Sequence, residues 1–157
     1  MKTLVVFYSK TGRTRKAAEA LAGLLGAELE ELRERGVNRF GVIGSLKAGR
    51  DALRKRAVEL EPAAHDPAGF DQVVLGSPVW VGTLCPAVRA YAASQAGAIR
   101  KAAFFCTHGG GGAARSFTEA AALLGKPLEA TLELRDKDVD RGEAGEALAA
   151  FAKRLAG

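Results

Sequence analysis

Short runs of apolar residues recur along the chain with the length of β-strands. They lie at residues 3–8, 72–76, 102–107 and 128–134, with a weaker run at 27–32. Within residues 4–7 and 73–75 the apolar positions are continuous, whereas a strand with one face in solvent alternates apolar and polar residues. The pattern therefore predicts strands that are buried on both faces, as in a parallel sheet.

Helix-length segments separate these runs. Apolar residues with helical spacing occur in residues 17–25, 46–60, 117–124 and 144–155, and residues 86–95 have helical length with weaker periodicity. Five strands that alternate with five helices predict an α/β fold. We expect a doubly wound, five-stranded parallel sheet with helices on both of its faces.

The length of 157 residues predicts a single domain that spans residues 1–157. No segment approaches the ~20 apolar residues of a membrane span, and no signal peptide is recognisable. Cys85 and Cys106 are too few for a disulfide framework, and neither belongs to a cluster of metal-ligand spacing. A cytoplasmic protein without a metal site is expected. Residues 36–49 predict a long connection, either ordered or mobile.

The basic residues are unevenly distributed. The net charge is +5, but residues 33–56 contain eight basic side chains against two acidic ones, and the rest of the chain is close to neutral. Such a segment attracts acidic surfaces, phosphates or anionic lipid, although a solvated surface helix has the same composition. We expect a docking face on this segment, formed by Lys47, Arg50, Arg54, Lys55 and Arg56.

A hydroxyl-rich loop follows the first predicted strand and leads directly into the first predicted helix. Its residues are Ser9, Lys10, Thr11, Gly12, Arg13 and Thr14. Free amides at a helix N-terminus, three hydroxyls and a glycine favour phosphate binding, with simple helix capping as the alternative. The spacing excludes a P-loop and a G-x-G-x-x-G fingerprint. Eight residues between Cys106 and Arg115 argue against a cysteine phosphatase loop, and Leu75 stands where a receiver domain needs aspartate.

Two further loops follow the third and fourth predicted strands. The first contains Trp80, the only tryptophan of the chain, and the second contains the glycine run 109–112. A large aromatic side chain in a loop favours stacking on a flat ligand, and glycines leave backbone groups accessible to a polar edge. The alternatives are a tryptophan packed in the core and a flexible glycine turn. With the phosphate loop, these loops predict a site for a flat heterocycle that carries one phosphate.

The sequence resembles the flavodoxin family. The three loops carry the resemblance, and it covers essentially the whole chain. The phosphate loop is similar to the family motif S/T-x-T-G-x-T, and the other two loops resemble its flavin-ring loops. The resemblance implies strand order 2-1-3-4-5 and noncovalently bound FMN. It implies that the phosphate is held by Ser9, Thr11, Gly12 and Thr14, that Trp80 flanks the ring, that Gly82 lies near flavin N5, and that residues 108–110 meet the pyrimidine edge.

The full set of expected cofactor-binding residues covers all three loops. It comprises Ser9, Lys10, Thr11, Gly12, Arg13, Thr14, Ser77, Pro78, Val79, Trp80, Val81, Gly82, Thr107, His108, Gly109, Gly110 and Gly111. His108 could also donate a proton to a reduced flavin. The isoelectric point of about 9.5 departs from the acidic character of flavodoxin electron carriers.

The resemblance implies an FMN-binding electron carrier with no catalytic residue of its own. Its expected partners are redox proteins with acidic docking faces, and not nucleic acid. An FMN-dependent NAD(P)H:quinone oxidoreductase and a non-flavin interaction module on the same fold remain as alternatives. Because the predicted loops are short and leave little room for a nicotinamide, the carrier is favoured.

Overall fold

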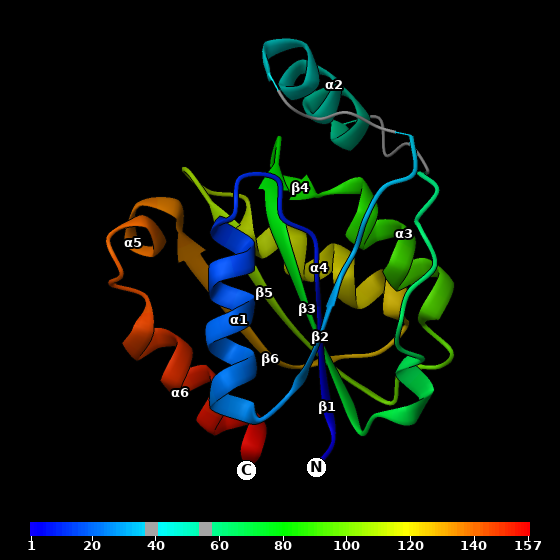
Figure 1. The fold of residues 1–157 in the computed structure, drawn as a ribbon, viewed down its shortest axis with the longest axis vertical. Helices are drawn as coiled ribbons and strands as arrows, with labels where there is room; N and C mark the ends of the chain where they lie inside the picture. The colour runs from blue at the N-terminus through cyan, green and yellow to red at the C-terminus, as the bar shows by residue number, and fades with distance from the viewer. Residues whose placement is uncertain (37–40, 54–57) are drawn as a thin grey trace.

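A parallel sheet forms the centre of the computed structural model, which describes residues 1–36, 41–53 and 58–157 (Figure 1). The strands are β1 (Thr3–Phe7), β2 (Glu28–Glu31), β3 (Gln72–Trp80), β4 (Thr83–Leu84), β5 (Lys101–His108) and β6 (Leu128–Arg135). Five of them run parallel in the order β2-β1-β3-β5-β6, and β4 pairs antiparallel with the end of β3. The predicted fold class and strand order are confirmed.

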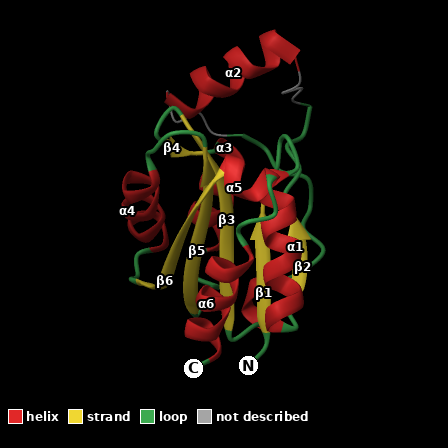
Figure 2. Ribbon diagram, turned by 90° about the vertical axis from the view of Figure 1, so that its left-hand side faces the viewer, coloured by secondary structure: helices red, strands yellow, loops and turns green. Residues whose placement is uncertain are grey.

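Helices cover both faces of the sheet. They are α1 (Arg13–Leu25), α2 (Gly41–Leu53), α3 (Pro86–Gln95), α4 (Ala113–Leu124), α5 (Asp136–Asp140) and α6 (Gly145–Ala156), with a 3-10 turn, η1, at Pro67–Gly69. Figure 2 shows α1 and α6 on one face and α4 on the other. The short helix α5 directly follows β6 and has no counterpart among the predicted elements.

The sheet divides the interior into two cores. Along β1, Leu4 and Val6 pack with α3 and α4, whereas Val5 and Phe7 pack with α1 and α6. Successive residues of a strand point to opposite faces, and helices cover both faces of this sheet, so all four side chains are buried. Burial on both faces explains why the apolar residues of this strand are continuous in the sequence.

The third main strand extends beyond its predicted end at residue 76. It continues to Trp80 and then turns back through β4, so Trp80 lies at a strand end and not in a loop. Val81 and Gly82 form the turn with φ of +51° and +72°. Positive φ at both central residues is the signature of a type I′ hairpin turn, which is unfavourable for a β-branched residue such as Val81.

Helix α2 lies beyond the carboxyl ends of the strands and not against a sheet face, as both views show (Figures 1 and 2). It begins at Gly41, so most of the segment predicted as a connection is helical. The helix predicted to reach Leu60 ends earlier, because Leu60 pairs with Glu34 in an isolated antiparallel bridge. Several positions of the predicted basic segment and of the predicted helix 46–60 lie outside the described residues. They are Arg39, Arg54, Lys55, Arg56 and Ala57.

Both ends of the chain lie at the amino ends of the strands, opposite α2 (Figure 1). No helix in the three described ranges is long and apolar enough to cross a bilayer.

Candidate functional site

A cavity of about 160 Å³ lies at the carboxyl ends of β1, β3 and β5. It is lined by Lys10, Thr11, Arg13, Thr14, Pro78, Val79, Trp80, Thr107 and Asp136. All of these residues except Asp136 belong to the set expected from the sequence. The structure therefore brings parts of three loops, distant in the sequence, around one space.

The first of these loops is ordered by Ser9, whose Oγ accepts hydrogen bonds from the amides of Gly12 (3.0 Å) and Arg15 (3.2 Å). Gly12 has φ of +96°, a conformation that glycine adopts without strain. The first hydrogen bond of α1 runs from the Lys16 amide to the Gly12 carbonyl. The amides of Arg13 and Thr14 lie ahead of that bond, where a helix has no internal acceptor for them. They are available to an anion.

Thr14 and Thr107 join the first loop to the end of β5. Their hydroxyl oxygens are 2.8 Å apart, and both side chains are buried. Each hydroxyl has one proton and two lone pairs, so the pair still has a donor or acceptor for a ligand in the cavity. From the sequence, Thr14 was expected in the loop before the first helix and Thr107 at the end of the fourth predicted strand, and both were expected at the site, but this contact was not predicted.

The two cations of the loop have different partners. Arg13 forms a bidentate contact with Asp140 (Nε to Oδ1, 2.9 Å) and lies 3.8 Å from Asp136. The hydrogen bond to Asp140 raises the pKa of Arg13 and lowers that of the Asp140 carboxyl. Lys10 donates to the neutral hydroxyl of Ser45 in α2 (2.6 Å). Lys10 thus brings positive charge to the cavity, whereas the charge of Arg13 is matched by carboxylates.

Trp80 forms an aromatic wall beside the cavity. It is half-buried and packs edge-on against Tyr8, with ring centroids 5.6 Å apart. A second hollow of about 250 Å³ lies next to it, lined by Lys10, Ser45, Ala48, Val79, Trp80 and Val81. Helix α2 therefore contributes Ser45 and Ala48 to this edge of the molecule. Neither residue was among the expected site residues, because residues 36–49 were predicted to be a long connection.

The glycine turn after β5 is held by two contacts. The Gly111 amide donates to His108 Nδ1 (3.0 Å), which orders the turn. A Cβ on Gly112 would come within 2.8 Å of Gly82 Cα and Val79 Cγ1, so only glycine fits where this turn packs on the hairpin. The turn is therefore fixed against β3 and β4 and is not a flexible segment of the surface.

The His108 side chain does not line the cavity at the strand ends. It is buried, and Nε2 lies 3.2 Å from Glu133 Oε2 without hydrogen-bond geometry. The ring borders a different hollow of about 290 Å³, next to α5 and α6. Proton donation from this side chain to a ligand in the cavity has no support in this arrangement.

The remaining expected residues lie around the cavity without lining it. Ser77 is fully buried, and its Oγ accepts from the Cys85 amide at 3.2 Å. Gly82 and the glycines 109–111 belong to the two turns described above. Asp136 was not among the expected site residues, although it follows directly after β6 and so reaches the same edge of the sheet.

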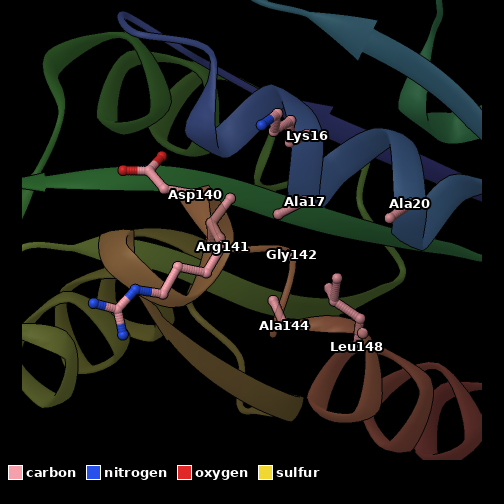
Figure 3. Close-up of a pocket in the computed structure, with 10 residues that line it drawn as sticks. Lys16, Ala17, Ala20, Asp140, Arg141, Gly142, Ala144 and Leu148 are labelled. Atoms are coloured by element: carbon pink, nitrogen blue, oxygen red, sulfur yellow. The ribbon is translucent and has the colours of Figure 1, made fainter.

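A larger cavity, of about 470 Å³, lies between α1 and the connection from α5 to α6 (Figure 3). Figure 3 shows Ala20 and Leu148 on its two sides, with the Arg141 side chain extending away from Leu148. Its Asp140 already binds Arg13. A specific ligand site needs several polar groups that converge on it. We therefore assign the candidate site to the strand ends. No group of metal-ligating side chains occurs among the residues that the structure describes.

No protein-family model and no curated protein matches the chain. Solved structures do. A Lactobacillus acidophilus flavoprotein in complex with FMN is 22% identical with a TM-score of 0.71, covering 89% of this chain and 97% of its own. A protein from Bacteroides uniformis assigned as a flavoprotein is 20% identical with a TM-score of 0.75, covering 97% of each chain. Flavodoxin 1 of Bacillus cereus is 18% identical with a TM-score of 0.58, covering 99% and 97%.

The chain has the flavodoxin fold. In this fold the strand order reverses between β1 and β3, and ligands bind outside the carboxyl ends of the strands at that point. The cavity formed by the Ser9–Thr14 loop, Trp80 and Thr107 lies there. Fold and cavity thus identify the same edge of the sheet as the candidate functional site.

Proposed function

We propose that the protein binds FMN noncovalently and serves as an electron carrier. The observation that supports this most directly is the cavity at the switch point of the flavodoxin fold, where a hydroxyl-bearing loop meets an aromatic wall. A ligand with a phosphate at one end and a flat ring at the other matches both features. The Lactobacillus neighbour in complex with FMN supports the same ligand class.

The residues that line the cavity fit the phosphate end of FMN in charge. The hydroxyls of Thr11 and Thr14, the amides of Arg13 and Thr14, and Lys10 would hold the phosphate, because they offer donors and one cation with a neutral partner. The cavity of about 160 Å³ is smaller than the roughly 300–1,000 Å³ typical of whole-ligand pockets. We therefore assign it to the phosphate end, and assign Trp80 and the hairpin to the ring.

FMN exchanges electrons singly or in pairs, and the protein controls which molecules reach it. A nicotinamide would have to lie within about 3 to 3.5 Å of the flavin for hydride transfer. Trp80, and α2 beside it, occupy the edge through which a nicotinamide would approach. This arrangement favours exchange with other proteins over the NAD(P)H:quinone oxidoreductase alternative.

We propose that the electron-transfer partners are proteins with an acidic docking face. The outward side of α2 carries Ile43 and Leu46, which are 82% and 70% exposed, next to the exposed Lys47 and Arg50. Exposed aliphatic side chains among cations match an acidic surface with an apolar centre. Because α2 lies beside Trp80, a protein docked there approaches the proposed flavin.

A cytoplasmic location agrees with two cysteines that are free and buried.

Binding of FMN and of riboflavin tests the proposal. The purified protein is expected to bind FMN at one to one and riboflavin more weakly. Replacing Thr11 and Thr14 by alanine should weaken FMN by about tenfold or more, as expected for lost hydrogen bonds to a charged group. Riboflavin affinity should stay nearly unchanged. Titration calorimetry measures all four affinities.

The control variant is Thr118→Ala, which removes an exposed hydroxyl on α4 away from the site. Equal losses for FMN and riboflavin would contradict the assignment of the phosphate loop. Wild-type protein that binds neither ligand would favour the non-flavin interaction module.

A further inference from the structure

A partly desolvated ion pair lies behind the β3–β4 hairpin. Arg89 of α3 donates from Nε to Glu119 Oε1 of α4 (2.8 Å), and the two side chains are only 11% and 12% exposed. Thr83 of β4 joins them. Its hydroxyl donates to Glu119 Oε2 (2.5 Å) and accepts from Arg89 Nη2 (3.2 Å). Arg89 Nη2 also donates to the Leu84 carbonyl (3.0 Å). Thr83 is thus bound to both helices, and Leu84 is bound to α3.

These contacts fix the hairpin that carries the aromatic wall. Thr83 is the cross-strand partner of Trp80, and Leu84 is the partner of Val79. The hairpin also packs against Gly112 at the start of α4. The turn itself is held with Val81 at φ +51°, which a β-branched residue does not favour. The surrounding contacts, and not the local sequence preference, therefore set the position of Trp80.

The ion pair is a costly way to achieve stability alone. Two charges removed from water lose hydration, and an apolar pair of similar volume is often as stable or more stable. Arg89 Nη1 is moreover buried with no hydrogen-bond partner among the described residues. The ion pair forms directed hydrogen bonds with Thr83 and the Leu84 carbonyl, and an apolar pair could not form them.

We propose that Arg89 and Glu119 are positioning residues, which act through Thr83 to hold Trp80 in the orientation that meets the flavin ring. The flavin part of this inference rests on the proposed function. The positioning part concerns the protein without any ligand, so the two can be tested separately.

Trp80 is the only tryptophan, so its fluorescence reports on the hairpin in the ligand-free protein. Two variants separate positioning from stability. Glu119→Gln leaves Arg89 without its charge partner and should lower the unfolding midpoint. The double variant Arg89→Met/Glu119→Leu removes both charges and should recover most of that midpoint. In the folded double variant, acrylamide should quench Trp80 at least about twofold more readily, because Thr83 and the Leu84 carbonyl lose their hydrogen bonds to both side chains. Glu119→Gln keeps the Arg89 hydrogen bonds and should show a smaller increase.

Ligand affinity gives a second readout. The double variant should bind riboflavin about tenfold more weakly, with FMN weakened by the same factor, because the phosphate loop is unchanged. The control is Lys2→Gln, which breaks an exposed ion pair with Glu28 at the opposite end of the strands and should change neither quenching nor affinity.

Unchanged Trp80 quenching in both folded variants would overturn the inference. So would a double variant whose quenching returns to the wild-type value together with its stability, because the pair would then have a purely structural role. If quenching changes as expected but the wild-type protein binds no flavin, the positioning role stands and the proposed function fails.

Discussion

At the scale of single residues, burial determines the chemistry of both thiols. Cys85 and Cys106 are fully buried, and desolvation raises their pKa values to about 11 and about 12. For Cys85 a hydrogen bond with Ser77 opposes this effect without cancelling it. Both groups are therefore neutral at physiological pH, and neither can serve as a thiolate nucleophile.

These shifts predict a stability that falls at alkaline pH. An unfolded thiol ionises near pH 9, whereas the folded protein keeps its proton until about pH 11 or 12. Between these values the folded state binds more protons, so the free energy of unfolding should fall by about 1.4 kcal/mol per pH unit for each thiol. Urea unfolding between pH 8 and pH 10.5 measures how the free energy of unfolding depends on pH. The variant Cys85→Ala/Cys106→Ala should flatten the dependence, and an unchanged slope would contradict the assignment.

The direction of individual side chains was the least predictable feature of the site. Thr107 could be placed from the sequence because it lies at the end of a buried strand, and Thr11 and Thr14 because they belong to the short loop and helix start that follow one. His108 could not, because its ring is held by the Gly111 amide and borders the hollow next to α5 and α6 instead of the cavity. Ser9 likewise turns inward to the amides of its own loop. Such choices depend on hydrogen bonds that form only after the loop has folded.

At the scale of elements, α1 contains a matched pair of glycines. Gly23 lies inside the helix and Gly26 caps its end with φ +60°, and a Cβ at either position would meet no atom within 4 Å. Only the backbone conformation differs between them. Gly23→Ala should stabilise the protein by about 0.5–1 kcal/mol, because alanine restricts the unfolded chain.

Gly26→Ala should instead destabilise by about 1–2 kcal/mol, because the left-handed conformation brings Cβ close to the backbone. Thermal unfolding of both variants tests the pair. Similar shifts in the same direction would mean that the cap does not require positive φ.

The buried strands were the most predictable elements, and α2 was the least. Residues in β1, β3 and β5 are apolar on both faces, and this pattern leaves few alternatives to a parallel sheet. In α2, Gly41, Gly44 and Gly49 lower the helix propensity, so its first part was predicted to be a connection, although residues 46–53 fall within the helix predicted over residues 46–60. Tertiary contact compensates, since Ala48 is buried beside the hairpin. Contacts with distant residues also extended β3 to Trp80.

At the scale of the whole molecule, the basic residues of α2 and the candidate site lie at the same end of the sheet. Lys47 and Arg50 lie beside the hairpin on α2, whereas Lys153 and Arg154 are exposed near the end of α6. Reversing the first pair to glutamate should slow reduction of the FMN-loaded protein by a reduced ferredoxin, an acidic donor, by about tenfold at low salt. Reversing the second pair should have a smaller effect. The difference should shrink at high ionic strength, where charges are screened within about 8 Å or less.

Stopped-flow mixing measures these rates, with NADH alone as a parallel donor. Direct reduction by NADH should be slow. Fast reduction by NADH with sustained turnover of a quinone would overturn the carrier assignment in favour of the quinone oxidoreductase. Equal rates for both charge reversals would mean that the basic residues of α2 are a solvated surface without a docking role. Tighter binding of the protein to anionic vesicles than to the ferredoxin would indicate that its partner is a membrane surface.

The location of the chain ends has a practical consequence for electrochemistry. Residues 1 and 157 lie at the end of the molecule opposite α2 and the hairpin (Figure 1). A linker at either terminus can therefore attach the protein to a gold electrode with its functional edge facing the solution. A linker in place of an exposed residue of α2 would turn that edge toward the metal. The two immobilised forms would present the same protein in opposite orientations, one for exchange with soluble proteins and the other for direct exchange with the electrode.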